Sequence, residues 1–161
     1  MAIASVLTDS FKTELMRSGH NFDTAGATPA GSAFKLALYT SSANLGTTTT
    51  VYSATNEITN DAGTAYSAGG KALTNSGVTT STVTSHTDFA DLSVANGTAW
   101  TSASFTTRGC LIYNTSIVSG FTNNRAVCSI DFGGDKTVSN GTFSIEFPTN
   151  SSSAAIIRLT S

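Results

Sequence analysis

Charged residues are scarce in this sequence. Only 11% of its 161 residues are Asp, Glu, Lys or Arg, and the formal net charge at pH 7 is -2. Binding to nucleic acid or to an anionic membrane surface requires an excess of positive charge, so we expect neither as a partner. Ser and Thr together account for 51 residues. The surface is therefore expected to present hydroxyl and amide groups in place of ions.

Long apolar runs are missing as well. The longest contain four residues, as in 110–113 and 154–157, whereas a membrane-spanning helix needs roughly 18 or more. Residues 1–16 mix polar and charged residues among the apolar ones, so we expect no secretory signal and assign synthesis to the cytosol. In that compartment the two cysteines are expected to stay reduced.

Residues that would form a catalytic or metal site are few and poorly spaced. The two histidines, His20 and His86, have no neighbouring metal ligands at a suitable spacing. The tripeptide 131–133 reads Asp-Phe-Gly, but the other protein-kinase motifs are absent, and it is interpreted as a strand ending in a turn. No nucleophile elbow occurs and no spacing identifies a carboxylate pair. We expect no catalytic residue, no metal and no cofactor, and a protein that is not an enzyme.

What the sequence does contain is a series of short β-type segments. Residues 34–40 alternate Phe, Leu and Leu with other residues, the period-2 pattern of a strand with one buried face. Other segments rich in Thr, Val, Ile, Phe and Tyr are separated by Gly, Asn, Asp and Ser. These further expected strands are 47–53, 70–73, 77–84, 87–92, 103–113, 125–132, 142–147 and 155–160.

This pattern predicts an all-β fold. Eight or nine short strands with 14 glycines and two prolines are typical of an antiparallel two-sheet sandwich with jelly-roll or immunoglobulin-like Greek-key connections, preceded here by a short N-terminal α-helix. A closed barrel is the alternative. We expect a helix and extended arm over residues 1–33, followed by a β-sandwich domain over residues 34–161.

The expected helix over residues 3–17 carries large apolar side chains four residues apart, at Ile3, Leu7, Phe11 and Leu15. Such a stripe must be covered, either by the chain's own β domain or by a neighbouring subunit. The irregular segment that follows favours the second possibility. These four residues are therefore the candidate interaction site.

The segments 103–113 and 125–132 are expected to form an antiparallel hairpin. If Tyr113 lies opposite Arg125, then Cys110 lies opposite Cys128, and the apolar residues of both strands share one face. We expect two neighbouring buried thiols in place of a disulfide bond.

Several phrases of the chain, taken together, resemble a family of small structural proteins of tailed bacteriophages. The resemblance extends over nearly the whole sequence and is carried by residues 20–22, 37–45, 52–57, 66–73, 107–113, 126–136, 143–148 and 155–159.

The resemblance implies a non-enzymatic virion protein, assembled in the cytoplasm of the bacterial host and binding the major capsid protein or other virion subunits, with homo-oligomer formation expected. The favoured role is a capsid decoration or cement protein that stabilises the assembled shell. A tail or neck component, such as a tube, completion or adaptor protein, is the alternative. A carbohydrate-binding fibre module is less favoured; Trp100 would be its stacking residue, although core packing is the preferred reading of that side chain.

Overall fold

The computed structural model describes residues 2–59, 65–116 and 120–161. In these parts the chain forms one short helix and eight strands, which confirms the predicted all-β class with a helix near the N-terminus. Within the described residues, no helix is long and apolar enough to cross a membrane. The elements are β1 (Val6–Leu7), α1 (Asp9–Met16), β2 (Phe34–Tyr39), β3 (Lys71–Leu73), β4 (Asn75–Ser81), β5 (Thr84–Phe89), β6 (Trp100–Asn114), β7 (Arg125–Phe143) and β8 (Ile157–Thr160).

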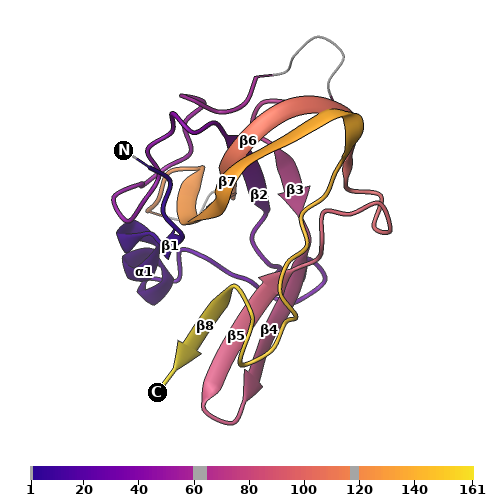
Figure 1. Cartoon of the computed structure of the whole chain (residues 1–161). Coiled ribbons are helices and arrows are strands. Elements are labelled where there is room, and N and C mark those ends of the chain that lie inside the picture. Colours follow the sequence, from indigo (N-terminus) through magenta and orange to yellow (C-terminus); the bar gives the residue numbers. More distant parts are fainter. Residues whose placement is uncertain (1, 60–64, 117–119) are drawn as a thin grey trace.

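The strands form two antiparallel sheets, the two-sheet sandwich that the sequence predicts. The larger sheet has the order β1-β7-β6-β2-β3 and the smaller one the order β4-β5-β8. Two long strands, β6 and β7, arch over one end of the molecule, while the β4–β5 hairpin extends from the other end (Figure 1). The C-terminus lies beside the smaller sheet, at the end of β8, whereas the N-terminus lies near the larger sheet, at about the height of β6 and β7 (Figure 1).

The centre of the larger sheet is buried on both faces. Leu36 and Leu38 of β2 belong to the main core between the sheets, whereas Ala37 and Tyr39 belong to a second apolar cluster on the other face. The expectation of a single buried face for this strand is therefore wrong. The second face is covered because the segment after β2 folds back over it and contributes Ala43 and Leu45 to the cluster.

The N-terminal helix is shorter than predicted. It begins at Asp9, because Thr8 is extended and its hydroxyl accepts the backbone N–H of Phe11, an N-cap that separates the helix from the preceding residues. Val6 and Leu7 instead form β1, which pairs with Ser129 and Cys128 of β7. The predicted helical stripe is consequently divided between an extended segment and a helix.

Two of the expected strands are absent as regular strands. Residues 47–53 form an irregular segment with one bridge, between Val51 and Arg125. Residues 144–147 follow β7 with a single bridge between Ile145 and Leu92. Conversely, β7 continues eleven residues beyond the predicted end at Phe132, because its second half pairs with the first half of β6.

The register of the β6–β7 hairpin also differs from the prediction. Cys110 lies opposite Ile130, and Cys128 lies opposite Ile112, a shift of two residues from the expected pairing. The ladder contains irregularities between Ile112 and Tyr113 and between Thr107 and Gly109, and each inserted residue changes the pairing beyond it. A two-residue shift preserves the face, so both cysteines remain in the main core as free thiols.

Candidate functional site

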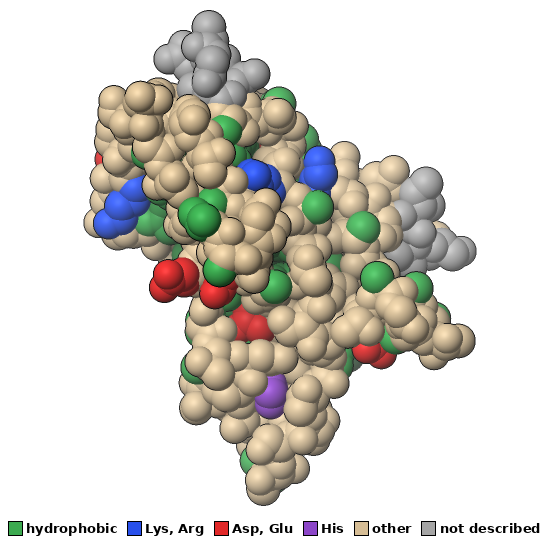
Figure 2. Space-filling model, turned by 90° about the vertical axis from the view of Figure 1, so that its right-hand side faces the viewer, with side chains coloured by type: hydrophobic (Ala, Val, Ile, Leu, Met, Phe, Trp, Pro, Cys, Tyr) green, Lys and Arg blue, Asp and Glu red, His purple; other side chains and the backbone are tan. Residues whose placement is uncertain are grey.

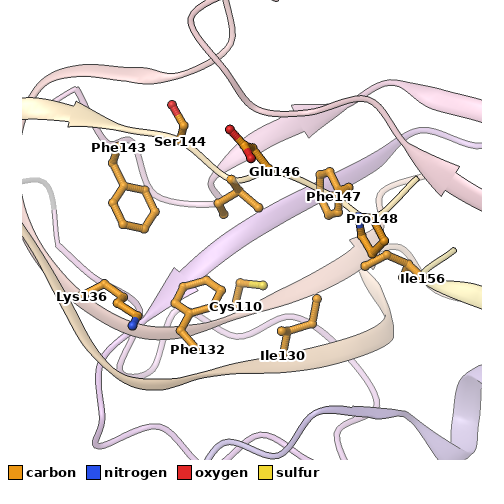
Figure 3. Close-up of a pocket in the computed structure, with 11 residues that line it drawn as sticks. Cys110, Ile130, Phe132, Lys136, Phe143, Ser144, Glu146, Phe147, Pro148 and Ile156 are labelled. Carbon is orange, nitrogen blue, oxygen red and sulfur yellow. The ribbon is translucent and has the colours of Figure 1, made fainter. Parts of the chain in front are cut away.

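An apolar cleft lies between β7 and the segment that follows it. Its volume is about 520 Å³, within the usual range for a binding cavity. Ile130 and Phe132 of β7 line one wall, and Phe143, Ile145 and Phe147 line the other. Figure 3 shows these two walls facing each other, with Cys110 between them and Ile156 at one end.

The alternation of side chains makes the cleft apolar inside and polar outside. Along residues 143–147, which begin at the last residue of β7 and continue into the segment after it, Phe143 and Phe147 are half-buried, whereas Ser144 and Glu146 are exposed. In Figure 3 the hydroxyl of Ser144 and the carboxylate of Glu146 point away from the cleft. This is the period-2 alternation of an extended chain. The ring centroids of Phe132 and Phe143 are 6.5 Å apart across the cleft.

Backbone hydrogen bonds to buried or half-buried carboxylates hold the outer wall in place. Asp91 Oδ1 accepts the backbone N–H of Phe147 at 2.8 Å, and Asp88 Oδ2 accepts that of Ile156 at 3.1 Å. Burial raises the pKa of the Asp88 carboxyl above its ordinary value. Both aspartates thus fasten the segment 144–156 to β5 and to the chain that follows it.

The lining of the cleft is suited to binding an apolar group and offers no reactive side chain. Cys110 is fully buried at its floor, and burial raises the pKa of this thiol well above its ordinary value, so it is a poor nucleophile. Lys136 and Glu146 are the charged residues of the lining, and both are exposed. Among the lining residues, no nucleophile is hydrogen-bonded to a general base, the arrangement that nucleophilic catalysis requires.

The four predicted interaction residues do not form one exposed stripe. Ile3 is 4% exposed and lies in the second apolar cluster, while Phe11 is 1% exposed and lies in the main core. Leu7 and Leu15 are half-buried against the main core. Ile3 and Phe11 are thus covered by the chain's own β structure, which corrects the expectation that they await a neighbouring subunit.

Residues 2–33, the expected arm, are attached to the larger sheet by a buried polar network. Glu14 of α1 is 2% exposed, and its Oε1 accepts the Nε–H of Arg125 on β7 at 2.7 Å. The other guanidinium nitrogen, Nη2, contacts the same oxygen. On the far side of the carboxylate, Oε2 lies 2.9 Å from Nε2 of His20. Sequence reasoning missed this network because its members are up to 111 residues apart.

A second buried carboxylate, that of Glu57, accepts hydrogen bonds from two tyrosine hydroxyl groups. Glu57 Oε1 accepts the hydroxyl of Tyr66 at 2.5 Å and the backbone N–H of Gly69 at 2.7 Å, and Oε2 accepts the hydroxyl of Tyr52 at 2.6 Å. Tyr113 donates to the carbonyl of Gly69. Burial, together with the Glu57 charge, raises the pKa of Tyr113 to about 12. The cluster holds residues 52–57 and 66–69 against β2 and β6.

Other residues considered from the sequence are also engaged in structural contacts. Asp131 forms a two-pronged ion pair with Arg108 across the hairpin, at 2.7 and 3.2 Å. Trp100, the proposed stacking residue, is fully buried, so the core-packing reading is correct. His86 Nδ1 lies 2.8 Å from Oδ1 of Asn150. In the described ranges, no three His, Cys, Asp or Glu side chains are placed to bind a metal ion together.

Comparison with known proteins adds no relative. Neither a protein-family model, nor a curated protein, nor a solved structure matches this chain.

Proposed function

We propose that this chain is a non-enzymatic structural protein of a tailed-phage virion, and specifically a decoration or cement protein that binds the assembled capsid shell. The resemblance of its sequence to small virion proteins suggests this role. One structural observation carries the proposal: the buried carboxylates are used to hold the fold together, whereas an apolar surface remains open to a partner. Buried Glu14, Glu57 and Asp88 all hold parts of the fold together, whereas the apolar cleft is left open.

The character of the surface supports an assembly role. Most of the face shown in Figure 2 is backbone or uncharged polar side chains, with few charged groups and small apolar patches. Such a surface buries contact area without desolvating many ions. Its contacts with the major capsid protein or another virion subunit are therefore expected to persist at high salt.

A carbohydrate-binding fibre role has less support. Stacking on sugar rings needs exposed aromatic faces, but Trp100, Tyr39, Tyr66 and Tyr113 are at most 2% exposed. Tyr52 is half-buried and stacks on Tyr113 with ring centroids 4.6 Å apart. Trp100 and the four tyrosines thus pack within the fold.

Quantitative mass spectrometry of purified virions tests the proposed role. A decoration protein should be present at a copy number comparable with that of the major capsid protein and should remain bound after a wash in molar salt. A copy number far below that of the capsid protein would instead assign the chain to the tail or neck, which is the alternative. Absence from purified virions would contradict the proposal altogether.

A further inference from the structure

The tripeptide Asn-Gly-Thr occurs twice in the chain, at 96–98 and at 140–142. An asparagine side chain reacts most readily with the main chain when glycine follows it, because glycine has no Cβ to hinder the approach of its backbone nitrogen. Both asparagines are exposed. Since the reacting pair and the residue after it are the same at the two sites, a difference in their reactivity has to come from the folded structure.

At the first site, hydrogen bonds hold both of the groups that would react. The side-chain Nδ2 of Asn96 donates to the carbonyl of Asp91 at 2.9 Å, and the backbone N–H of Gly97 donates to the carbonyl of Val94 at 3.0 Å. The backbone N–H of Asn96 also donates to Ser93 Oγ, at 3.4 Å. Ring closure at this site therefore requires hydrogen bonds to break and the turn to open.

At the second site, the asparagine side chain is less restrained. The backbone N–H of Asn140 donates to Ser104 Oγ at 2.8 Å, but its side-chain amide has no hydrogen-bond partner among the described residues. Asn140 has a φ of 44°, and the β6–β7 ladder is irregular on both sides of the adjacent pair, Ala103 with Gly141. An irregularity of this kind leaves a residue outside the regular pairing, so Asn140 has more freedom to react than Asn96.

We propose that Asn140 is a site of spontaneous deamidation and that the fold protects Asn96 from the same reaction. The backbone nitrogen of Gly141 attacks Cγ of Asn140 and gives up its proton. The bond from Cγ to Nδ2 breaks, and the nitrogen leaves as ammonia, which produces a cyclic succinimide. Water then opens the ring at either carbonyl and yields aspartate or isoaspartate.

Each event changes both the charge and the main chain close to the apolar cleft. The formal net charge of -2 becomes more negative by one, because a neutral amide is converted to a carboxylate. Isoaspartate also adds one atom to the main chain of β7 shortly before Phe143, which lines the cleft. The reaction depends on the fold of the isolated chain and not on the proposed virion role.

Peptide mapping of the purified protein after incubation in warm, mildly alkaline buffer tests the proposal. Trypsin cleaves after Lys and Arg and places the two sites in separate peptides, 72–108 and 137–158, and fragment spectra locate the new acid. In the native protein the acid should form roughly tenfold faster at 140 than at 96, since two hydrogen bonds must break first at 96. In guanidinium chloride the two rates should be similar, because no fold distinguishes the sites.

Equal rates at the two sites of the native protein, or a faster rate at 96, would overturn the proposal. A difference that persists unchanged in the denaturant would do the same, since it would then come from the sequence. Asn140→Gly adds a second measurement, because glycine accepts a positive φ and carries no amide. The acidic species that ion-exchange chromatography separates from aged wild-type protein should be lost in Asn140→Gly and retained in the matched variant Asn96→Gly; its persistence in Asn140→Gly would contradict the assignment.

Discussion

His20 and Glu14 share a buried hydrogen bond, with His20 Nε2 at 2.9 Å from Glu14 Oε2. The side-chain N–H of Asn114 points at the other ring nitrogen, Nδ1, at 3.1 Å. An amide nitrogen can only donate, so Nδ1 accepts and the neutral ring donates from Nε2. Burial lowers the pKa of His20 to about 4, and Arg125 supplies the positive charge for Glu14.

Stability should consequently fall in mild acid. In the unfolded chain His20 binds a proton near pH 6.5, but in the folded chain it does so only near pH 4. Between these pH values the unfolded state holds more protons than the folded state. The contribution of neutral His20 to the free energy of unfolding is therefore complete above pH 6.5 and is lost as the pH falls towards 4. The loss is on the order of 2–3 kcal/mol, measurable by urea unfolding at several pH values.

The variant His20→Gln identifies the residue responsible. It removes the titrating ring and keeps an amide donor for Glu14, so the difference in stability between pH 7 and pH 4 should shrink. Lys12→Gln, an exposed change on the same helix, should retain the wild-type pH dependence. An unchanged pH dependence in His20→Gln would show that another group causes the acid sensitivity.

Loss of the Glu14 carboxylate should destabilise the fold. Glu14→Gln leaves the half-buried guanidinium of Arg125 without its counter-charge, and breaking such a pair costs about 3 kcal/mol. The exposed pair of Lys12 and Asp9 provides the comparison: Lys12→Gln should change the free energy of unfolding by less than about 1 kcal/mol. Equal effects in the two variants would mean that α1 is not attached through Glu14.

The two tyrosines that donate to Glu57 should differ in importance. Tyr66 is buried and, besides donating to Glu57, accepts the backbone N–H of Leu38 at 2.9 Å. Tyr66→Phe leaves that N–H unpaired and should cost about 2–3 kcal/mol. Tyr52→Phe removes one hydrogen bond from a half-buried residue and should cost about 1 kcal/mol. Chemical unfolding of both variants decides; a larger effect of Tyr52→Phe would refute this ranking.

Both thiols should be unreactive in the folded protein. Cys110 and Cys128 are buried and free, and burial raises the pKa of Cys128 to about 12. Thiol reagents should therefore label neither cysteine until the protein is unfolded, and should then label both, as mass spectrometry of the alkylated protein can measure. Fast labelling of the native protein, or unlabelled cysteines after unfolding without reductant, would contradict the structure.

Local patterns in the sequence were sufficient for the β class and for several strands. The alternation over residues 34–40 identified β2, whose observed bounds are Phe34–Tyr39. The apolar residues of 103–113 identified the buried half of β6, and Trp100 was correctly assigned to the core. These features depend on side-chain period and hydrophobicity, which neighbouring residues already express.

The register of β6 and β7 needed the tertiary structure. A pairing of Cys110 with Cys128 and one with Ile130 place the same apolar residues on the same face, so the pattern alone does not distinguish them. The irregularities in the ladder decide between them, because each inserted residue changes the pairing beyond it.

By itself, the sequence determined a charge-poor, hydroxyl-rich β protein with a short N-terminal helix. Only the tertiary structure decided that Ile3 and Phe11 are covered by their own chain and that an apolar cleft opens beside Phe132 and Phe143. The same holds for the pairing of Glu14 with Arg125. The physical reason is that burial and ion pairing depend on which distant segments meet, whereas a side-chain pattern reports only that a residue prefers to be covered.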